Sequence, residues 1–171
     1  MPDLPTADPA AAANSLAFRK VMGRFATGVA IVSLVRSDST IGAMTINSLV
    51  SVSLDPMLIS WSVQNTSSHC GDFVSADRFA VSILAQDQQV LARRYATRGD
   101  AAQIAGDFAF TGGGLPVIAG ALAHLECERW ALHPAGDHML VLGQVTGFST
   151  GTASRPLTFF GGRFGSLAEE T

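Results

Sequence analysis

Short apolar runs, many of them rich in β-branched residues, alternate with turn-forming polar residues along most of the chain. An apolar stripe follows Asn14 and Ser15, either of which can cap a helix, and it ends at Gly28. Later runs are bounded by Gly, Pro, Asn, Asp or Ser, which is typical of strands. They predict strands over residues 29–35, 41–47, 57–63, 79–84, 121–131, 138–149 and 156–160.

Two further helices are expected, a short one from Ser67 or Ser68 to about residue 76 and another over residues 87–95. The strands therefore outnumber the helices, and short turns join many of them. A doubly wound sheet needs strand and helix to alternate throughout, which this chain does not do. The pattern predicts a mainly β (α+β) fold, a closed and largely antiparallel barrel with a few peripheral helices.

The 171 residues suffice for one domain with a substantial core. Residues 1–13 are rich in Pro, Ala and Asp and show no periodicity, so we expect a disordered N-terminal tail. A single domain is expected over residues 14–167, followed by a short C-terminal tail over residues 168–171.

Charged residues are scarce, at 15% of the chain against 47% hydrophobic, whereas soluble domains average about 25% charged. A formal net charge of −3 provides no basic field, so nucleic acid is not an expected partner. No apolar stretch approaches the roughly 18 residues of a membrane helix, and no membrane contact is expected. The high share of hydrophobic residues suggests more apolar surface than a monomer would expose, which favours an oligomer.

The two cysteines, Cys70 and Cys127, lie far apart and without the spacing of metal ligands, so no metal site is expected. Unpaired thiols and the lack of a signal-peptide pattern favour the cytoplasm. Motifs of a Rossmann dinucleotide site, a P-loop or a hydrolase nucleophile are absent. The glycines at 112–114 are interpreted as a flexible connection.

One segment, residues 42–56, interleaves hydroxyl and amide side chains with apolar ones in the order GAMTINSLVSVSLDP. It could be a half-exposed strand and turn with ordinary polar residues outside. Alternatively, it could present neutral hydrogen-bond donors and acceptors to a planar ligand such as a flavin, whose ring edge needs several neutral partners. The residues by themselves leave both interpretations open.

This segment resembles the signature of the short-chain flavin reductase family, and further motifs follow the family order from about residue 18 to residue 167. The matching motifs read RFATGV from Arg24, NTSSH from Asn65, RFAVSIL from Arg78, GALAHLEC from Gly120, GDH from Gly136 and FGGRF from Phe160. One such motif would be a weak signal, whereas the ordered series is a strong one.

The resemblance implies a split β-barrel of the FMN-binding flavin reductase type, Greek-key-like and homodimeric. It implies hydride transfer from NADH or NADPH to FMN or FAD, and supply of the reduced flavin to a partner flavin-dependent monooxygenase. The alternatives are a protein whose bound flavin reduces another acceptor, such as a ferric chelate or a corrinoid, and a non-catalytic flavin-binding module. The choices between FMN and FAD and between NADH and NADPH stay open.

The same resemblance assigns residues to the cofactors. Thr45, Asn47 and Ser48 would line the isoalloxazine edge, with Ser51 close by. Residues 62–64 would follow the ribityl chain, 67–68 would lie near the phosphate at a helix start, and 160–163 would help form the nicotinamide site. The cofactor-binding set comprises Thr45, Ile46, Asn47, Ser48, Ser51, Ser62, Val63, Gln64, Ser67, Ser68, Ser82, Phe160, Gly161, Gly162 and Arg163.

His138 is the catalytic candidate, because the GDH match favours contact with the nicotinamide over a histidine that only completes a turn. Asp137 would order the turn or orient the His138 ring. Arg163 could pair with a phosphate or ribose, or form a surface salt bridge. His69 could be structural or functional.

Overall fold

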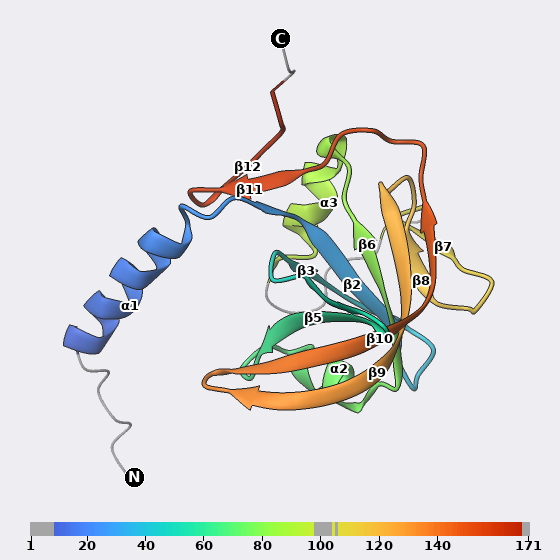
Figure 1. Cartoon of the computed structure of the whole chain (residues 1–171), viewed down its shortest axis with the longest axis horizontal. Coiled ribbons are helices and arrows are strands. Elements are labelled where there is room, and N and C mark those ends of the chain that lie inside the picture. Colours follow the sequence, from blue (N-terminus) through green and yellow to red (C-terminus); the bar gives the residue numbers. More distant parts are fainter. Residues whose placement is uncertain (1–8, 98–103, 105, 169–171) are drawn as a thin grey trace.

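The computed structural model describes residues 9–97, 104 and 106–168. A seven-stranded antiparallel sheet forms the body of the protein, with its strands in the order β3-β2-β6-β9-β10-β5-β4 (Figure 1). The strands are β2 (Ala30–Val35), β3 (Ile41–Ile46), β4 (Val50–Leu54), β5 (Met57–Gln64), β6 (Arg78–Ile83), β9 (Ala123–Ala135) and β10 (His138–Thr150). The neighbours β6 and β9, like β10 and β5, are far apart in the chain, as in Greek-key arrangements.

The edges of this sheet are β3 and β4, which follow each other in the chain but do not pair. After β3 the chain turns away, and β4 pairs with β5 in the register Val50 to Ser60. The barrel is therefore split at the seam between β3 and β4, not closed as the strand pattern alone predicted. The mainly β prediction is confirmed.

Smaller elements surround the barrel, and α1 projects from it beside the β11–β12 hairpin (Figure 1). They are α1 (Pro9–Met22), β1 (Thr27–Gly28), α2 (Cys70–Ser75), the 3-10 turn η1 (Gln86–Gln88), α3 (Gln89–Arg94), β7 (Phe108–Phe110), β8 (Pro116–Ile118), β11 (Thr158–Phe160) and β12 (Arg163–Gly165). β7 and β8 form a hairpin, and β11 pairs with both β1 and β12. The three-residue strands β7, β8 and β12 were not predicted, because such short pieces carry no readable periodicity.

The barrel core is organised around Trp61 on β5, which meets the rings of Phe73 and Phe79 edge to face at centroid distances of 5.1 and 5.6 Å. All three side chains are buried. Gly143 on β10 lies against this cluster, and a Cβ atom there would stand 2.5 Å from the Phe79 ring. A glycine at this position therefore lets β10 approach the core.

The first helix differs from its prediction at both ends. It begins at Pro9 rather than at Asn14 or Ser15, so part of the tail expected over residues 1–13 is helical. Proline suits a first helical position, and the four alanines that follow have the highest helix propensity. Residues 1–8 of that tail, and 169–171 of the C-terminal one, lie outside the described residues. The helix ends at Met22, because residues 27–28 are drawn into pairing with β11.

Candidate functional site

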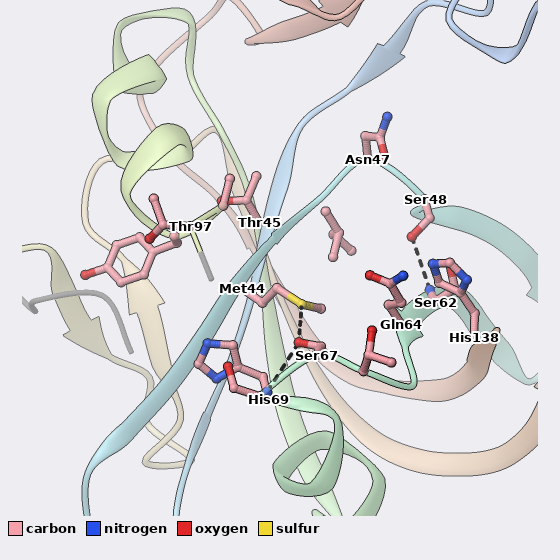
Figure 2. Close-up of a pocket in the computed structure, with 15 residues that line it drawn as sticks. Met44, Thr45, Asn47, Ser48, Ser62, Gln64, Ser67, His69, Thr97 and His138 are labelled. Carbon is pink, nitrogen blue, oxygen red and sulfur yellow. Dashed lines mark hydrogen bonds between the residues drawn. The ribbon is translucent and has the colours of Figure 1, made fainter. Parts of the chain in front are cut away.

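A cavity of about 460 Å³ opens beside the seam of the barrel (Figure 2). Its size falls within the roughly 300–1,000 Å³ of small-molecule sites. Four stretches of chain and the first residue of β10 supply its lining: Met44, Thr45, Ile46, Asn47, Ser48, Ser62, Gln64, Thr66, Ser67, Ser68, His69, Tyr95, Ala96, Thr97 and His138. Among the residues that the structure describes, this lining contains no Asp, Glu, Lys or Arg, and hydroxyl and amide groups provide most of its polarity.

Two hydroxyls in this cavity have opposite hydrogen-bonding roles. Thr45 on β3 donates its hydroxyl proton to the carbonyl of Ala92 at 2.8 Å, so Thr45 Oγ1 is left with lone pairs and can only accept from a ligand. Ser48 instead accepts from the backbone N–H of Ser62 at 3.1 Å, and its own proton has no acceptor among the described residues. The cavity thus presents an acceptor at Thr45 and a donor at Ser48.

The segment before α2 forms one wall, and its hydroxyls are held in place by contacts with the barrel. Ser67 Oγ accepts from the backbone N–H of His69 at 3.3 Å and donates to the sulfur of Met44 at 3.8 Å (Figure 2). His69 is buried, and a guanidinium nitrogen of Arg36 lies 3.2 Å from its Nδ1. Arginine can only donate, so Nδ1 accepts and the ring proton resides on Nε2.

Arg36 is itself fixed, because its Nε donates to the carboxylate of Asp72 at 2.8 Å. A positive charge therefore stands behind His69 without lining the cavity. Because the Asp72 carboxylate pairs with this charge, the guanidinium acts on the cavity by holding the His69 ring in place.

His138 lies at the opposite wall, where β10 begins, in register with Gln64 on β5. The side chain is about 40% exposed, which places it at the mouth of the cavity. Its Nδ1 lies 2.8 Å from the carboxylate of Asp137, and because a carboxylate accepts, Nδ1 is the donor. This hydrogen bond lowers the pKa of Asp137, orients the ring, and leaves Nε2 available to a ligand.

The chain after α3 closes a third side of the cavity. The backbone N–H of Thr45 donates to the carbonyl of Tyr95 at 2.9 Å, which joins this stretch to β3. The buried Tyr95 hydroxyl donates to Asp107 at 2.7 Å, and Arg94 pairs with the same carboxylate. Burial, together with the Asp107 carboxylate, raises the pKa of Tyr95 well above its usual range.

Comparison with known proteins identifies the family. The family described as "Flavin reductase like domain" matches residues 22–168. The chain belongs to this family. The split barrel that the motif series implied is thereby confirmed, as are the flavin reductase motifs themselves.

Its relatives span nearly the whole chain. This flavin reductase-like domain is 41% identical over 157 residues to the FMN reductase (NADH) SmoA of Agrobacterium fabrum, covering 92% of this chain and 88% of SmoA. It is 32% identical over 163 residues to HsaB of Rhodococcus jostii, a flavin-dependent monooxygenase reductase subunit, covering 93% and 83% of the two chains. Among solved structures it resembles the Streptomyces globisporus NADH:FAD oxidoreductase SgcE6, in complex with NAD and FAD fragments, with a TM-score of 0.85 and 34% identity over 96% of this chain and 98% of that one.

Most of the sequence-predicted site residues of this flavin reductase-like domain gather in the seam cavity. Those lining it are Thr45, Ile46, Asn47, Ser48, Ser62, Gln64, Ser67, Ser68 and His138. Ser51 lies on β4, exposed and outside the cavity lining, and Val63 is buried in the core because adjacent strand residues face opposite sides. Ser82 is fully buried in the barrel wall, where its hydroxyl accepts from the backbone N–H of Ile118.

The C-terminal motif lies at a separate hollow of about 510 Å³. Phe160, Gly161 and Gly162 line it together with Arg19, Lys20, Gly23 and Arg24 of the α1 end, while Arg163 stands outside the lining. The C-terminal motif therefore meets a cluster of cations, not the hydroxyls of the seam cavity.

The sequence reasoning missed several lining residues. Met44 and Thr66 adjoin predicted positions and could have been included on that ground, and His69 was left undecided. Tyr95, Ala96 and Thr97 carried no signal, because only tertiary pairing brings the end of α3 to β3. Among the described residues no cluster of potential metal ligands occurs, and no helix there is long and apolar enough to cross a membrane.

Proposed function

We propose that this flavin reductase-like domain transfers hydride from NADH to FMN or FAD in the seam cavity and supplies the reduced flavin to a partner flavin-dependent monooxygenase. One observation carries the proposal: a cavity with no Asp, Glu, Lys or Arg in its described lining, which offers the Thr45 acceptor on β3 and the Ser48 donor in the loop that follows β3. The relatives SmoA and HsaB, named an FMN reductase (NADH) and a monooxygenase reductase subunit, support it.

The residues present fit a flavin. Its ring edge alternates hydrogen-bond donors and acceptors, and neutral partners satisfy both without fixing a charge beside a ring that changes its own. Thr45 accepts, Ser48 donates, and Asn47 can do both. At the other end of the cavity the hydroxyls of Ser67 and Ser68 suit a phosphate.

A bound flavin supplies the hydride-accepting nitrogen, and the chain supplies position. Thr45 and Ser48 fix the plane and direction of the ring from the seam. His138, whose ring is oriented by Asp137, would contact the nicotinamide from the cavity mouth. Reacting atoms held about 3–3.5 Å apart gain most of the rate available from positioning. No acid or base among the described lining residues is needed for the transfer itself.

The activity is tested by mixing the purified chain with NADH and FMN or FAD and following the nicotinamide absorbance. Oxidation that depends on added flavin is expected. If neither flavin supports oxidation of NADH or NADPH, the proposal is wrong. Tight flavin retention without oxidation would instead indicate a non-catalytic flavin-binding module.

The role of His138 is tested with His138→Ala, matched by His133→Ala on the same hairpin but outside the cavity. The first substitution is expected to raise the KM for NADH more than the KM for flavin, and the second to change neither. A larger effect on flavin than on NADH would contradict the nicotinamide contact.

We further propose that the protein is a homodimer in which α1 packs on a second copy. The helix stands away from the barrel (Figure 1). Its large apolar side chains are more than half exposed: Leu16, Phe18, Val21, Met22 and, just beyond the helix, Phe25. So much apolar surface in water favours association.

Light scattering on the purified chain tests the dimer. The wild-type mass is expected to be twice that of one chain. The Val21→Glu substitution is expected to lower the measured mass toward that of a single chain. Val90→Glu on α3 replaces an equally exposed valine away from α1 and is expected to leave the dimer intact. A monomeric wild-type chain would contradict the proposal.

We place the protein in the cytoplasm, because Cys70 and Cys127 are both free thiols and reducing compartments preserve free thiols. Fractionation of cells that express the chain is expected to recover it with cytoplasmic markers. Recovery outside the cytoplasm would contradict this assignment.

A further inference from the structure

Ser82, which the motif series assigned to the flavin, instead supports a histidine at a second cavity. Its buried hydroxyl accepts from the backbone N–H of Ile118 at 2.9 Å and lies 3.3 Å from Nδ1 of His124. A buried hydroxyl proton requires an acceptor, and of these two neighbours only Nδ1 can accept. Burial lowers the pKa of His124, which agrees with a neutral ring whose proton resides on Nε2.

His124 lines a cavity of about 410 Å³ that shares no lining residue with the seam cavity. The β7–β8 hairpin forms one wall and the strands β9 and β10 form the other. In Figure 1 this hairpin lies on the side of the barrel away from α1. The lining comprises Ala109, Phe110, Thr111, Gly112, Val117, His124, Glu126, Phe148 and Ser149.

Two polar side chains of this cavity, His124 and Glu126, offer a hydrogen-bond donor and an acceptor. His124 and Glu126 are two residues apart on β9, so their side chains leave the same face of the strand. His124 offers the Nε2 proton, and Glu126 offers carboxylate oxygens. The carboxylate charge is compensated by Arg78, whose guanidinium lies 3.8 Å from it. A ligand hydroxyl complements such a pair, because its oxygen accepts from the imidazole while its proton goes to the carboxylate.

The apolar part of the lining suits an aromatic ring. Val117 is buried there, whereas Phe110 and Phe148 remain 62% and 68% exposed. An aromatic ligand that packs on exposed phenylalanine rings buries apolar surface and makes edge-to-face contacts, and both stabilise its binding. The volume is within the range of small-ligand sites.

We propose that the cavity between the β7–β8 hairpin and β9 binds a small phenolic compound, with the hydroxyl on His124 and Glu126 and the ring beside Phe110 and Phe148. This site is separate from the flavin cavity and does not depend on flavin reduction. Ser82 acts as a positioning residue, because it fixes the tautomer of His124 from within the barrel wall.

The experiment uses the full ¹⁵N-labelled chain, titrated with phenol and, in parallel, with toluene, which has the same shape without the hydroxyl. Phenol is expected to shift the amide signals of residues 109–112, 124 and 126 with a dissociation constant in the millimolar range or below. Toluene is expected to bind at least about tenfold more weakly, the equivalent of one hydrogen bond of ordinary strength. Equal binding of the two probes, or no shift at these residues, would overturn the proposal.

The variant Glu126→Gln keeps the size of the side chain and removes the carboxylate. It is expected to weaken phenol binding about tenfold and to leave toluene binding unchanged. Glu128→Gln is the matched control, because it removes a carboxylate from the same strand outside the cavity lining. If phenol binds Glu126→Gln as tightly as the wild-type chain, or shifts only the residues of the seam cavity, the proposed site is wrong.

Discussion

The hydroxyl of Ser48 accepts a hydrogen bond from the backbone N–H of Ser62 at 3.1 Å, and this contact ties the loop after β3 to β5 across the split of the barrel. It satisfies a backbone donor of β5 that β4 does not reach, because the pairing of β4 begins at Val50 opposite Ser60. It also sets the direction of the serine proton, which is left for the cavity. The same contact therefore supports the fold and prepares a ligand donor.

Replacing Ser48 with alanine removes both functions of this hydroxyl. We expect the KM for flavin to rise about fivefold to tenfold, because an ordinary hydrogen bond contributes about 1 kcal/mol. Steady-state kinetics over flavin concentration measure the change. Ser48→Thr keeps the hydroxyl and is expected to retain most of the affinity, so an equal loss in both variants would contradict the hydrogen-bond assignment.

Replacing Thr45 with valine preserves its shape but leaves the carbonyl of Ala92 without its hydrogen bond. We expect the free energy of unfolding to fall by about 1–3 kcal/mol, the usual cost of an unsatisfied buried group. Urea unfolding of Thr45→Val and of the control Thr45→Ser measures it. An unchanged midpoint for the valine variant would show that Thr45 does not secure the end of α3.

The glycine at 143 is required by the packing of Phe79. A methyl group there would stand 2.5 Å from a fully buried ring that has no free space to move into. We expect Gly143→Ala to lower the free energy of unfolding by about 1–3 kcal/mol, as overpacked cores do. Gly71→Ala is the control, since nothing lies within 4 Å of the added atom, and its stability is expected to stay unchanged or rise slightly.

Acid stability is expected to depend on Asp107. Burial acts to raise its pKa, but the hydrogen bonds from Tyr95 and Arg94 outweigh it, and the pKa of Asp107 is lowered. A carboxyl group whose pKa is lowered by folding stabilises the folded state at pH values above its unfolded-state pKa of about 3.9. This stabilisation is lost as the pH falls through the folded-state pKa. Urea midpoints measured from pH 7 down to pH 3 are expected to fall less steeply in Asp107→Asn than in the wild-type chain. Parallel pH profiles would contradict this role.

The two thiols are expected to differ in reactivity. Burial, with a smaller contribution from the charge of Glu126, raises the pKa of Cys127 to about 12, and the side chain is inaccessible. Cys70 is partly exposed at the start of α2. A thiol reagent at pH 8 should therefore modify one cysteine quickly in the native chain and both after denaturation. Mass spectrometry that finds Cys127 modified first would contradict the expectation.

Much of this protein could be predicted from its residues in order. Period-two and continuous apolar runs located the long strands, because burial on one or both faces of a sheet leaves a direct trace in sequence. The hydroxyl and amide side chains from Thr45 to Ser48 marked one wall of the seam cavity, which we propose as the flavin site, and the ordered motifs named the family. The start of α1 was misjudged, since four alanines carry helix propensity without an amphipathic pattern.

Only the tertiary structure decided which of these side chains meet. Ser82 lies in a motif that resembles a flavin-binding one, yet the pairing of β6 with β9 sets it against His124. Tyr95 and Thr97 reach the cavity only because the end of α3 hydrogen-bonds to β3. The sequence by itself determined most of the long strands, the hydroxyl- and amide-rich wall of the candidate site and the family. The split of the barrel, and with it the place of the site, came from long-range pairing, which depends on residues far apart in the chain and leaves no local pattern.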